Sequence, residues 1–209
     1  MVRVVSRKTG WRSVMERRLQ CVLHAMDQLQ DSKSGPRELH DARVACRRAE
    51  AALRVCRDLL STKRAQRLRL DIRKIRRATN ESRDQDVLRK WFTKQKGSES
   101  ARLCRIVEQH RDKVFPRMIK SMGNLQQLRD SVTHVTRPAR GSTSIGWQSC
   151  LGRRLLQEVY RFLEYIPEVD SETESLHEFR IAGKRLRYAV EFATEVLPKS
   201  NFRPLLRRL

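Results

Sequence analysis

The sequence predicts an all-α protein with two related halves, and three observations support this fold class. Apolar residues recur with helical periodicity along almost the whole chain. Alternation of β-branched residues, which is typical of a strand, occurs only around residues 131–136. A ten-residue pattern occurs twice, 137 residues apart, beginning at Leu39 and again at Leu176. We therefore expect helices throughout and a tandem duplication.

The first two helices should be separated by a clear break. Apolar residues between positions 19 and 29 recur on one helical face, and Ser34-Gly35-Pro36 then favours a turn. The next helix should begin near Arg37 and carry the first copy of the repeated pattern.

Three further amphipathic segments complete the first half. Residues 63–79 have an apolar face beside a row of arginines. Residues 80–96 follow and end at a break at Gly97. Residues 99–122 contain Pro116, which predicts a kink or a break in that helix.

A change in composition marks the boundary between the two halves. Residues 137–146 read Arg-Pro-Ala-Arg-Gly-Ser-Thr-Ser-Ile-Gly, which is typical of a linker. Beyond it, helical positions match the first half at the same offset, which places Ile72 opposite Leu209. We therefore expect a first half of residues 1–136 and a second half of residues 147–209, which is incomplete because its third helix has only begun.

Each copy of the pattern puts a histidine and a row of cations on one helical face. In the first copy, at about 100° per residue, a stripe roughly 60° wide contains His40, Arg43, Arg47 and Arg54. The second copy has an equivalent stripe of His177, Arg180 and Lys184, flanked by Arg187 and Tyr188. A duplicated cationic face predicts that the two halves converge on one anionic ligand.

The composition favours such a ligand. The chain has 46 lysines and arginines against 24 acidic residues, a net charge of +22, and a pI near 11.0. This charge favours polyanionic partners and opposes self-association. Arginine outnumbers lysine 35 to 11, and its planar fork can grip two phosphate oxygens at once. The composition alone is equally well explained by basic faces exposed to solvent. The preference for an anionic ligand therefore depends on the two cationic stripes.

Other classes of protein are disfavoured. The five cysteines have no CxxC spacing, as expected of reduced residues in a cytosolic protein. No apolar run approaches the ~18 residues of a membrane span. No HExxH or CxxC ligand set is present, so neither a metal nor another cofactor is expected. A polyphosphate hydrolase needs a carboxylate–metal cluster, and Asp84 and Asp86 are too isolated to form one. We therefore expect no enzymatic activity.

The sequence leaves two roles open for His40 and His177. Either histidine could donate to phosphate, as a cation only at lower pH. Either could instead hydrogen-bond a backbone or carboxylate group and fix helix packing. A phosphotransfer role is disfavoured, because no acceptor motif accompanies the arginine-rich helices.

Three motifs occur in order along nearly the whole chain. They are His40-x-x-Arg43-Val44-x-x-Arg47-Arg48, then Arg83-Asp84-Gln85-Asp86-Val87-Leu88, and finally Leu176-His177-x-x-Arg180-Ile181-x-x-Lys184-Arg185-Leu186-Arg187-Tyr188. Together they resemble the motifs of the CHAD family, whose name means conserved histidine α-helical domain. The resemblance implies two pseudo-symmetric, antiparallel helical bundles around a basic groove or channel that binds inorganic polyphosphate without catalysis.

The resemblance also assigns the binding residues, which lie on both signature helices and on the basic helix that follows the first one. They are His40, Arg43, Arg47, Arg48, Arg54, Arg69, Arg73, Arg76, His177, Arg180, Lys184, Arg185, Arg187 and Tyr188. This chain departs from the family pattern in two ways. Glu50 stands where the family usually has another arginine, and the closing helices of the second half are missing from the sequence.

The expected partner is inorganic polyphosphate or a similar phosphate polyanion, in the cytoplasm and in association with polyphosphate granules. A non-specific RNA- or DNA-binding protein is the main alternative. The aromatic content of 6% offers few platforms for stacking bases. No membrane partner is expected. The apolar face of the last helix should lean on the first half or on a second chain, or stay partly exposed.

Overall fold

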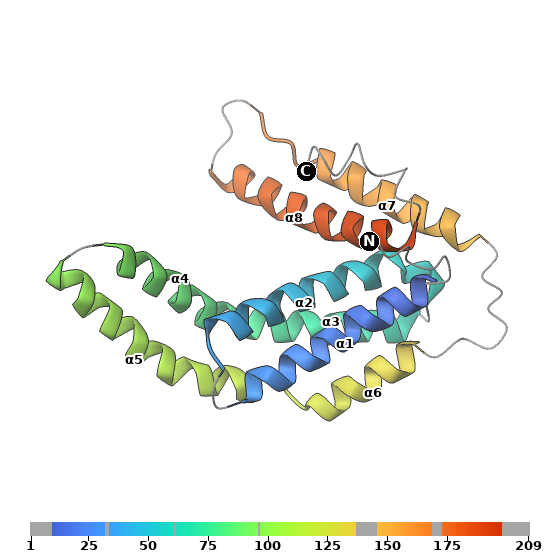
Figure 1. The fold of residues 1–209 in the computed structure, drawn as a ribbon. Coiled ribbons are helices and arrows are strands. Elements are labelled where there is room, and N and C mark those ends of the chain that lie inside the picture. The colour runs from blue at the N-terminus through green and yellow to red at the C-terminus, as the bar shows by residue number, and fades with distance from the viewer. Residues whose placement is uncertain are drawn as a thin grey trace, which may run out of the picture.

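The computed structural model describes residues 10–31, 34–60, 62–95, 97–136, 146–168 and 173–197. The regular elements in these ranges are eight α-helices and one 3₁₀ turn (Figure 1). They are α1 (Trp11–Gln30), α2 (Pro36–Val55), η1 (Arg57–Leu59), α3 (Thr62–Ala78), α4 (Asn80–Lys94), α5 (Ser98–Ser121), α6 (Leu125–Thr136), α7 (Trp147–Leu163) and α8 (Thr173–Val196). The predicted all-α class is confirmed.

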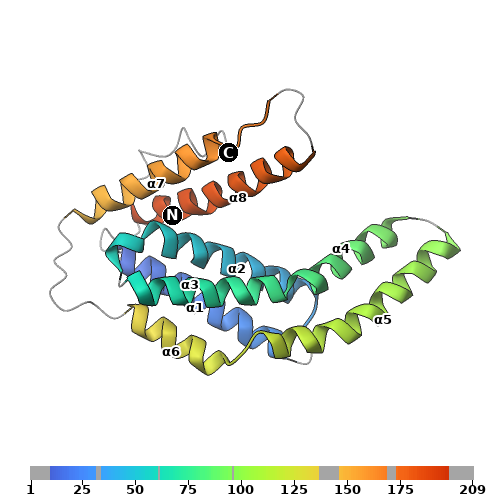
Figure 2. The ribbon, with the colours of Figure 1, turned by 180° about the vertical axis from the view of Figure 1, so that it is seen from behind.

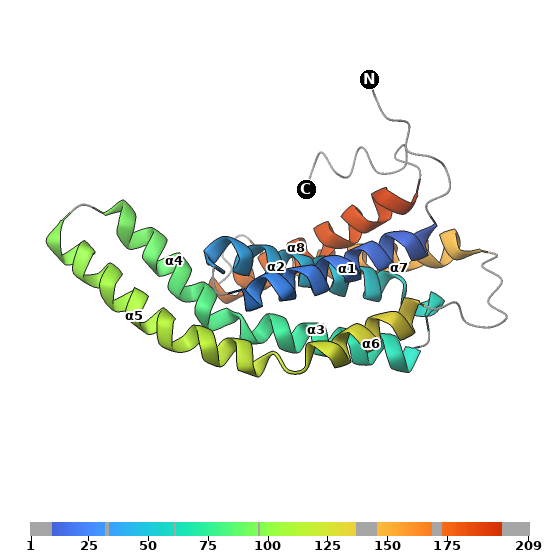
Figure 3. The same ribbon diagram turned by 60° about the horizontal axis from the view of Figure 1, so that its bottom comes forward.

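The helices form three groups in space. Helices α1, α2, α3 and α6 pack together as a bundle. Helices α4 and α5 form a long hairpin that projects beyond the end of this bundle (Figure 2; Figure 3). Helices α7 and α8 form an antiparallel pair, and α8 lies against α2. The second half, in the described residues, is therefore a helix pair attached to the first half.

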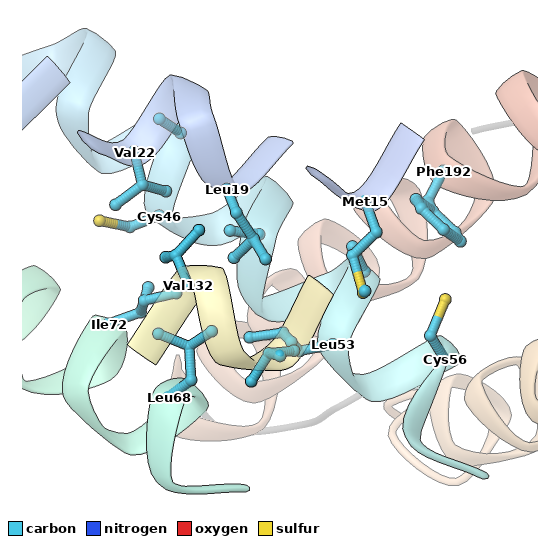
Figure 4. Close-up of a cluster of buried hydrophobic side chains, with 14 of the residues drawn as sticks. Met15, Leu19, Val22, Cys46, Leu53, Cys56, Leu68, Ile72, Val132 and Phe192 are labelled. Carbon is cyan, nitrogen blue, oxygen red and sulfur yellow. The ribbon is translucent and has the colours of Figure 1, made fainter. Parts of the chain in front are cut away.

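One hydrophobic core joins the first bundle to α8 (Figure 4). Leu53 of α2 and Phe192 of α8 are both almost completely buried in it. Helix α2 supplies mostly small side chains to this core, among them Ala49 and Ala52. Small side chains let neighbouring helices approach closely. Burial raises the pKa of the Cys46 thiol to about 12, so this free cysteine stays protonated and unreactive at neutral pH.

The helix boundaries have local causes. Pro36 begins α2, where the Gly35 amide donates to Glu38 Oε2 at 2.8 Å. Gly97 has φ of 131° between α4 and α5, a conformation that other residues rarely adopt. Of the predicted kink or break at Pro116, the break does not occur, because α5 continues through this residue.

Two sequence predictions fall on segments that are not described. The predicted linker lies outside the described residues except for Gly146. The segment 202–209, expected to begin another helix, also lies outside them.

The two halves bury matching positions to different extents. In α1, the apolar residues Leu19, Leu23, Met26 and Leu29 are 0–6% exposed. Their counterparts at the 137-residue offset are 48–58% exposed, namely Leu156, Tyr160, Leu163 and Ile166. The inner face of α8 is buried in the common core. The second half thus leans on the first mainly with α8, and among the described residues one apolar face of α7 remains exposed.

An ion pair at the end of α8 ties the two halves together. Glu195 accepts hydrogen bonds from Arg17 and Arg18 of α1. The Arg18 side chain is only 6% exposed, so its buried positive charge needs this carboxylate as a counterion. The Arg18 guanidinium also lies over the Phe192 ring, 5.5 Å from its centroid.

Glu195→Gln should lower the free energy of unfolding by about 1–3 kcal/mol, because it leaves the buried Arg18 charge without a counterion. Urea unfolding measures the change. Glu16→Gln is the matched control, since Glu16 is exposed on α1 and forms no ion pair among the described residues. Equal midpoints for the two variants would contradict this role of Glu195.

Candidate anion-binding face

The two histidine-bearing helices lie against each other. Helices α2 and α8 run in the same direction (Figure 1) and pack through their C-terminal halves. Arg48 Nε lies 3.0 Å from Glu191 Oε2, and Arg54 Nη2 lies 3.5 Å from the Arg185 carbonyl oxygen. Residues 173–178 of α8 are all exposed. The N-terminal part of α8, which carries His177, is therefore open to solvent, and His40 of α2 is exposed as well.

Arg43 lies on the predicted stripe, and one nitrogen of its guanidinium is hydrogen-bonded within the protein. Its Nη1 donates to the Arg76 carbonyl at 3.1 Å, to Thr79 Oγ1 at 2.7 Å and to Asn80 Oδ1 at 2.8 Å. These contacts tie α2 to the bend between α3 and α4. Burial, with repulsion from Arg47 and Arg76, lowers the pKa of Arg43.

Glu158 of α7 joins three arginines at the junction of α2, α7 and α8. Its carboxylate is 9% exposed and lies 3.3 Å from Arg54, 2.9 Å from Arg185 and 3.7 Å from Arg161. Burial lowers the pKa of Arg54 to about 10, although Glu158 opposes the shift. Arg54 and Arg185 therefore hold α2, α7 and α8 together.

Four more of the sequence-assigned residues have partners or are buried. Arg76 Nε lies 2.7 Å from Glu50, so the acid that departs from the family pattern binds a neighbouring arginine. Glu191 pairs with Arg48 at 3.0 Å and Arg187 at 3.6 Å. Tyr188 is 5% exposed and does not belong to the exposed face.

The other sequence-assigned residues have no hydrogen bond or ion pair in the described part of the chain. They are His40, Arg47, Arg69, Arg73, His177, Arg180 and Lys184. Arg69 lines a separate pocket of about 290 Å³ beside Arg54 and Arg57. The structure thus divides the fourteen assigned residues into a paired set at helix junctions and an unpaired set.

Lys184 is surrounded by positive charge. Its pKa is lowered by partial burial and then by repulsion from Arg180, Arg47 and Arg187. Arg47 belongs to α2 and the other two arginines to α8, so cations from the two halves act on one another. No carboxylate contributes to this shift. Such a cluster favours an anion, because an anion would relieve the repulsion.

The sequence assignment missed cations on α4. Arg83, Lys90 and Lys94 line a groove that also contains His40 of α2. Their spacing of seven and four residues puts them on one helical face. The same periodicity test that found the stripe on α2 would have found this one.

No three histidine, cysteine or acidic side chains of the described residues come together as a metal site would require. None of the described helices is long and apolar enough to cross a membrane.

A family model described as the CHAD domain matches residues 16–209. No curated protein matches the chain. The match includes both histidine-bearing helices and the α4–α5 hairpin between them.

Arg43→Ala should lower the free energy of unfolding by about 1–3 kcal/mol, because it removes the donor shared by three acceptors at the α3–α4 bend. Arg47→Ala should leave it within about 0.5 kcal/mol of the parent protein. Chemical unfolding of both variants separates a structural arginine from one available to a ligand. The assignment is wrong if Arg47→Ala proves the more damaging change.

Proposed function

The chain belongs to the CHAD family, and from this membership we propose that it binds inorganic polyphosphate through cations of α2 and α8. The CHAD domain is generally known to bind polyphosphate without catalysing a reaction. The core of the proposed site is Arg47, Arg180 and Lys184. Membership gives the class of ligand, and the arrangement of unpaired cations selects the residues.

The observation that carries this proposal is the repulsion among cations at Lys184. Partial burial lowers the pKa of this lysine most, repulsion from cations of α2 and α8 lowers it further, and no carboxylate opposes them. A linear polyphosphate has about one negative charge per phosphate and offers only oxygen acceptors. Arginine and lysine on two adjacent helices match that chemistry through charge-assisted hydrogen bonds and counterion release.

The paired arginines have a positioning role in this proposal. Arg54 and Arg185 join α2, α7 and α8 through Glu158, and Arg43 fixes α2 against the bend between α3 and α4. These arginines thereby hold the helices that carry the unpaired cations. His40 and His177 are exposed and have no hydrogen-bond partner in the described residues. This supports a role as phosphate donors more than a role in helix packing.

The proposal contains no catalytic step and no cofactor. Residues 1–136 and 147–209 act in it as two halves of one binding unit. A cytoplasmic location, with association with polyphosphate granules, remains part of the same hypothesis.

Replacing Arg47, Arg180 and Lys184 together by glutamine should weaken polyphosphate binding about a hundredfold. It should also reduce the slope of log affinity against log salt by about 2, because each lost phosphate contact removes about 0.7 from the slope for a single-stranded polyanion. Fluorescence anisotropy with labelled polyphosphate at several salt concentrations measures both quantities.

The matched control for this experiment is Arg102→Gln, Arg105→Gln and Lys113→Gln on α5. These three side chains are exposed and unpaired in the described residues, so the net charge falls equally. Equal losses in the two triple variants would mean that net charge alone drives binding. Tighter binding of single-stranded RNA than of polyphosphate by the parent protein would favour the nucleic-acid alternative.

Polyphosphate affinity should fall as the pH rises through the lowered pKa of Lys184 toward the ordinary lysine value of 10.5. A bound phosphate raises the pKa of this amine, so affinity is full below the pKa of the free protein and is lost above it. Lys184→Arg should flatten the profile from neutral pH to about pH 10, because arginine stays charged. A profile that is identical in the parent protein and this variant would remove Lys184 from the site.

A further inference from the structure

A groove of about 590 Å³ lies between the N-terminal part of α2 and helix α4. Its volume is in the range of ligand-binding pockets in proteins. Five of its lining residues are cations and one is a histidine, whereas one is acidic; the lining is Pro36, Arg37, His40, Arg83, Asp86, Arg89, Lys90, Thr93 and Lys94.

The acidic residues near the groove do not neutralise it. Asp86 is almost completely buried and binds Arg111 of α5 at 2.9 Å. Arg89 pairs with Glu108 of α5 at 2.6 Å, and Arg37 reaches Asp41 only at 4.0 Å. Arg83, Lys90 and Lys94 have no ion-pair partner in the described part of the chain.

The three unpaired cations form a row along α4. Lys94 lies eleven positions after Arg83, which corresponds to about 16 Å along the helix axis. The hairpin of α4 and α5 carries this row outward beyond the first bundle (Figure 2). The row therefore extends away from α8.

The row on α4 connects with the cations between α2 and α8. Arg43 lies within electrostatic range of Arg47 on α2 and of Asp84 and Arg83 on α4. Arg47 in turn acts on Lys184 of α8. Cations of α4, α2 and α8 therefore lie near enough to act on one another through their neighbours.

We propose that the groove between α2 and α4 binds the continuation of a long polyphosphate chain whose first part occupies the α2–α8 cations. This inference rests on the proposed function and adds a dependence of affinity on chain length. A short chain reaches only the α2–α8 cations, whereas a long chain also contacts His40, Arg83, Lys90 and Lys94. No phenylalanine, tyrosine or tryptophan lines the groove, so the His40 imidazole is the one ring in its lining on which a nucleic-acid base could stack.

The test compares two double variants. One combines Lys90→Gln and Lys94→Gln on α4, and the other combines Arg102→Gln and Arg105→Gln on α5. All four side chains are exposed and form no ion pair among the described residues, so both double variants should fold. The probes are tripolyphosphate and polyphosphate of about 100 units. The α4 variant should bind the long chain about tenfold more weakly than the α5 variant does and bind tripolyphosphate equally well. Adding Arg83→Gln should enlarge the loss for the long chain only.

Each other outcome overturns the inference in a distinguishable way. Equal long-chain affinities for the α4 and α5 variants would show that the groove does not contact the ligand. Equal losses for both chain lengths would make the groove the primary site instead of an extension. A loss confined to single-stranded RNA would assign the groove to nucleic acid. If the parent protein binds neither polyphosphate, the proposed function itself fails.

Discussion

The close packing around α2 is the constraint on which the rest of the structure depends. Its buried face is built largely from alanine, including Ala42, Ala49 and Ala52, so α1, α3 and α8 can all contact this one helix. A helix enclosed on so many sides can present polar side chains only along its margins. The cations of α2 therefore emerge in two places, beside α8 and beside α4. The position of the candidate site follows from this enclosure.

Electrostatics divides the cations into two functional groups. With 24 acidic residues against 46 basic ones, carboxylates cannot neutralise every arginine and lysine. Buried carboxylates such as Glu158 and Asp86 lie at helix junctions, where unpaired arginines would be costly. The cations outside these junctions repel one another in the free protein. A bound polyanion would offset that repulsion, so ligand binding and stability are linked.

Arg43 connects these two groups of cations. Its three hydrogen bonds hold the bend at Thr79, from which α4 leaves the bundle. The Asp86–Arg111 pair then joins α4 to α5 near the base of the hairpin. The direction of α4 relative to α2, and with it the shape of the α2–α4 groove, thus depends on an arginine that the ligand need not touch. A family motif can therefore contain residues that position a binding site as well as residues that contact the ligand.

The sequence by itself determined the helices, because apolar periodicity, Pro36 and Gly97 act within a few residues of one another. It also determined that both histidine-bearing helices would carry cations on one face, which is a property of the 3.6-residue repeat. It did not reveal that Arg43 forms hydrogen bonds within the protein while Arg47, four residues later on the same stripe, has no partner among the described residues. It did not reveal that Tyr188 is buried or that His40 faces α4. Periodicity gives the direction of a side chain around its own helix, whereas only the tertiary structure decides which carboxylate, carbonyl or neighbouring helix stands opposite it.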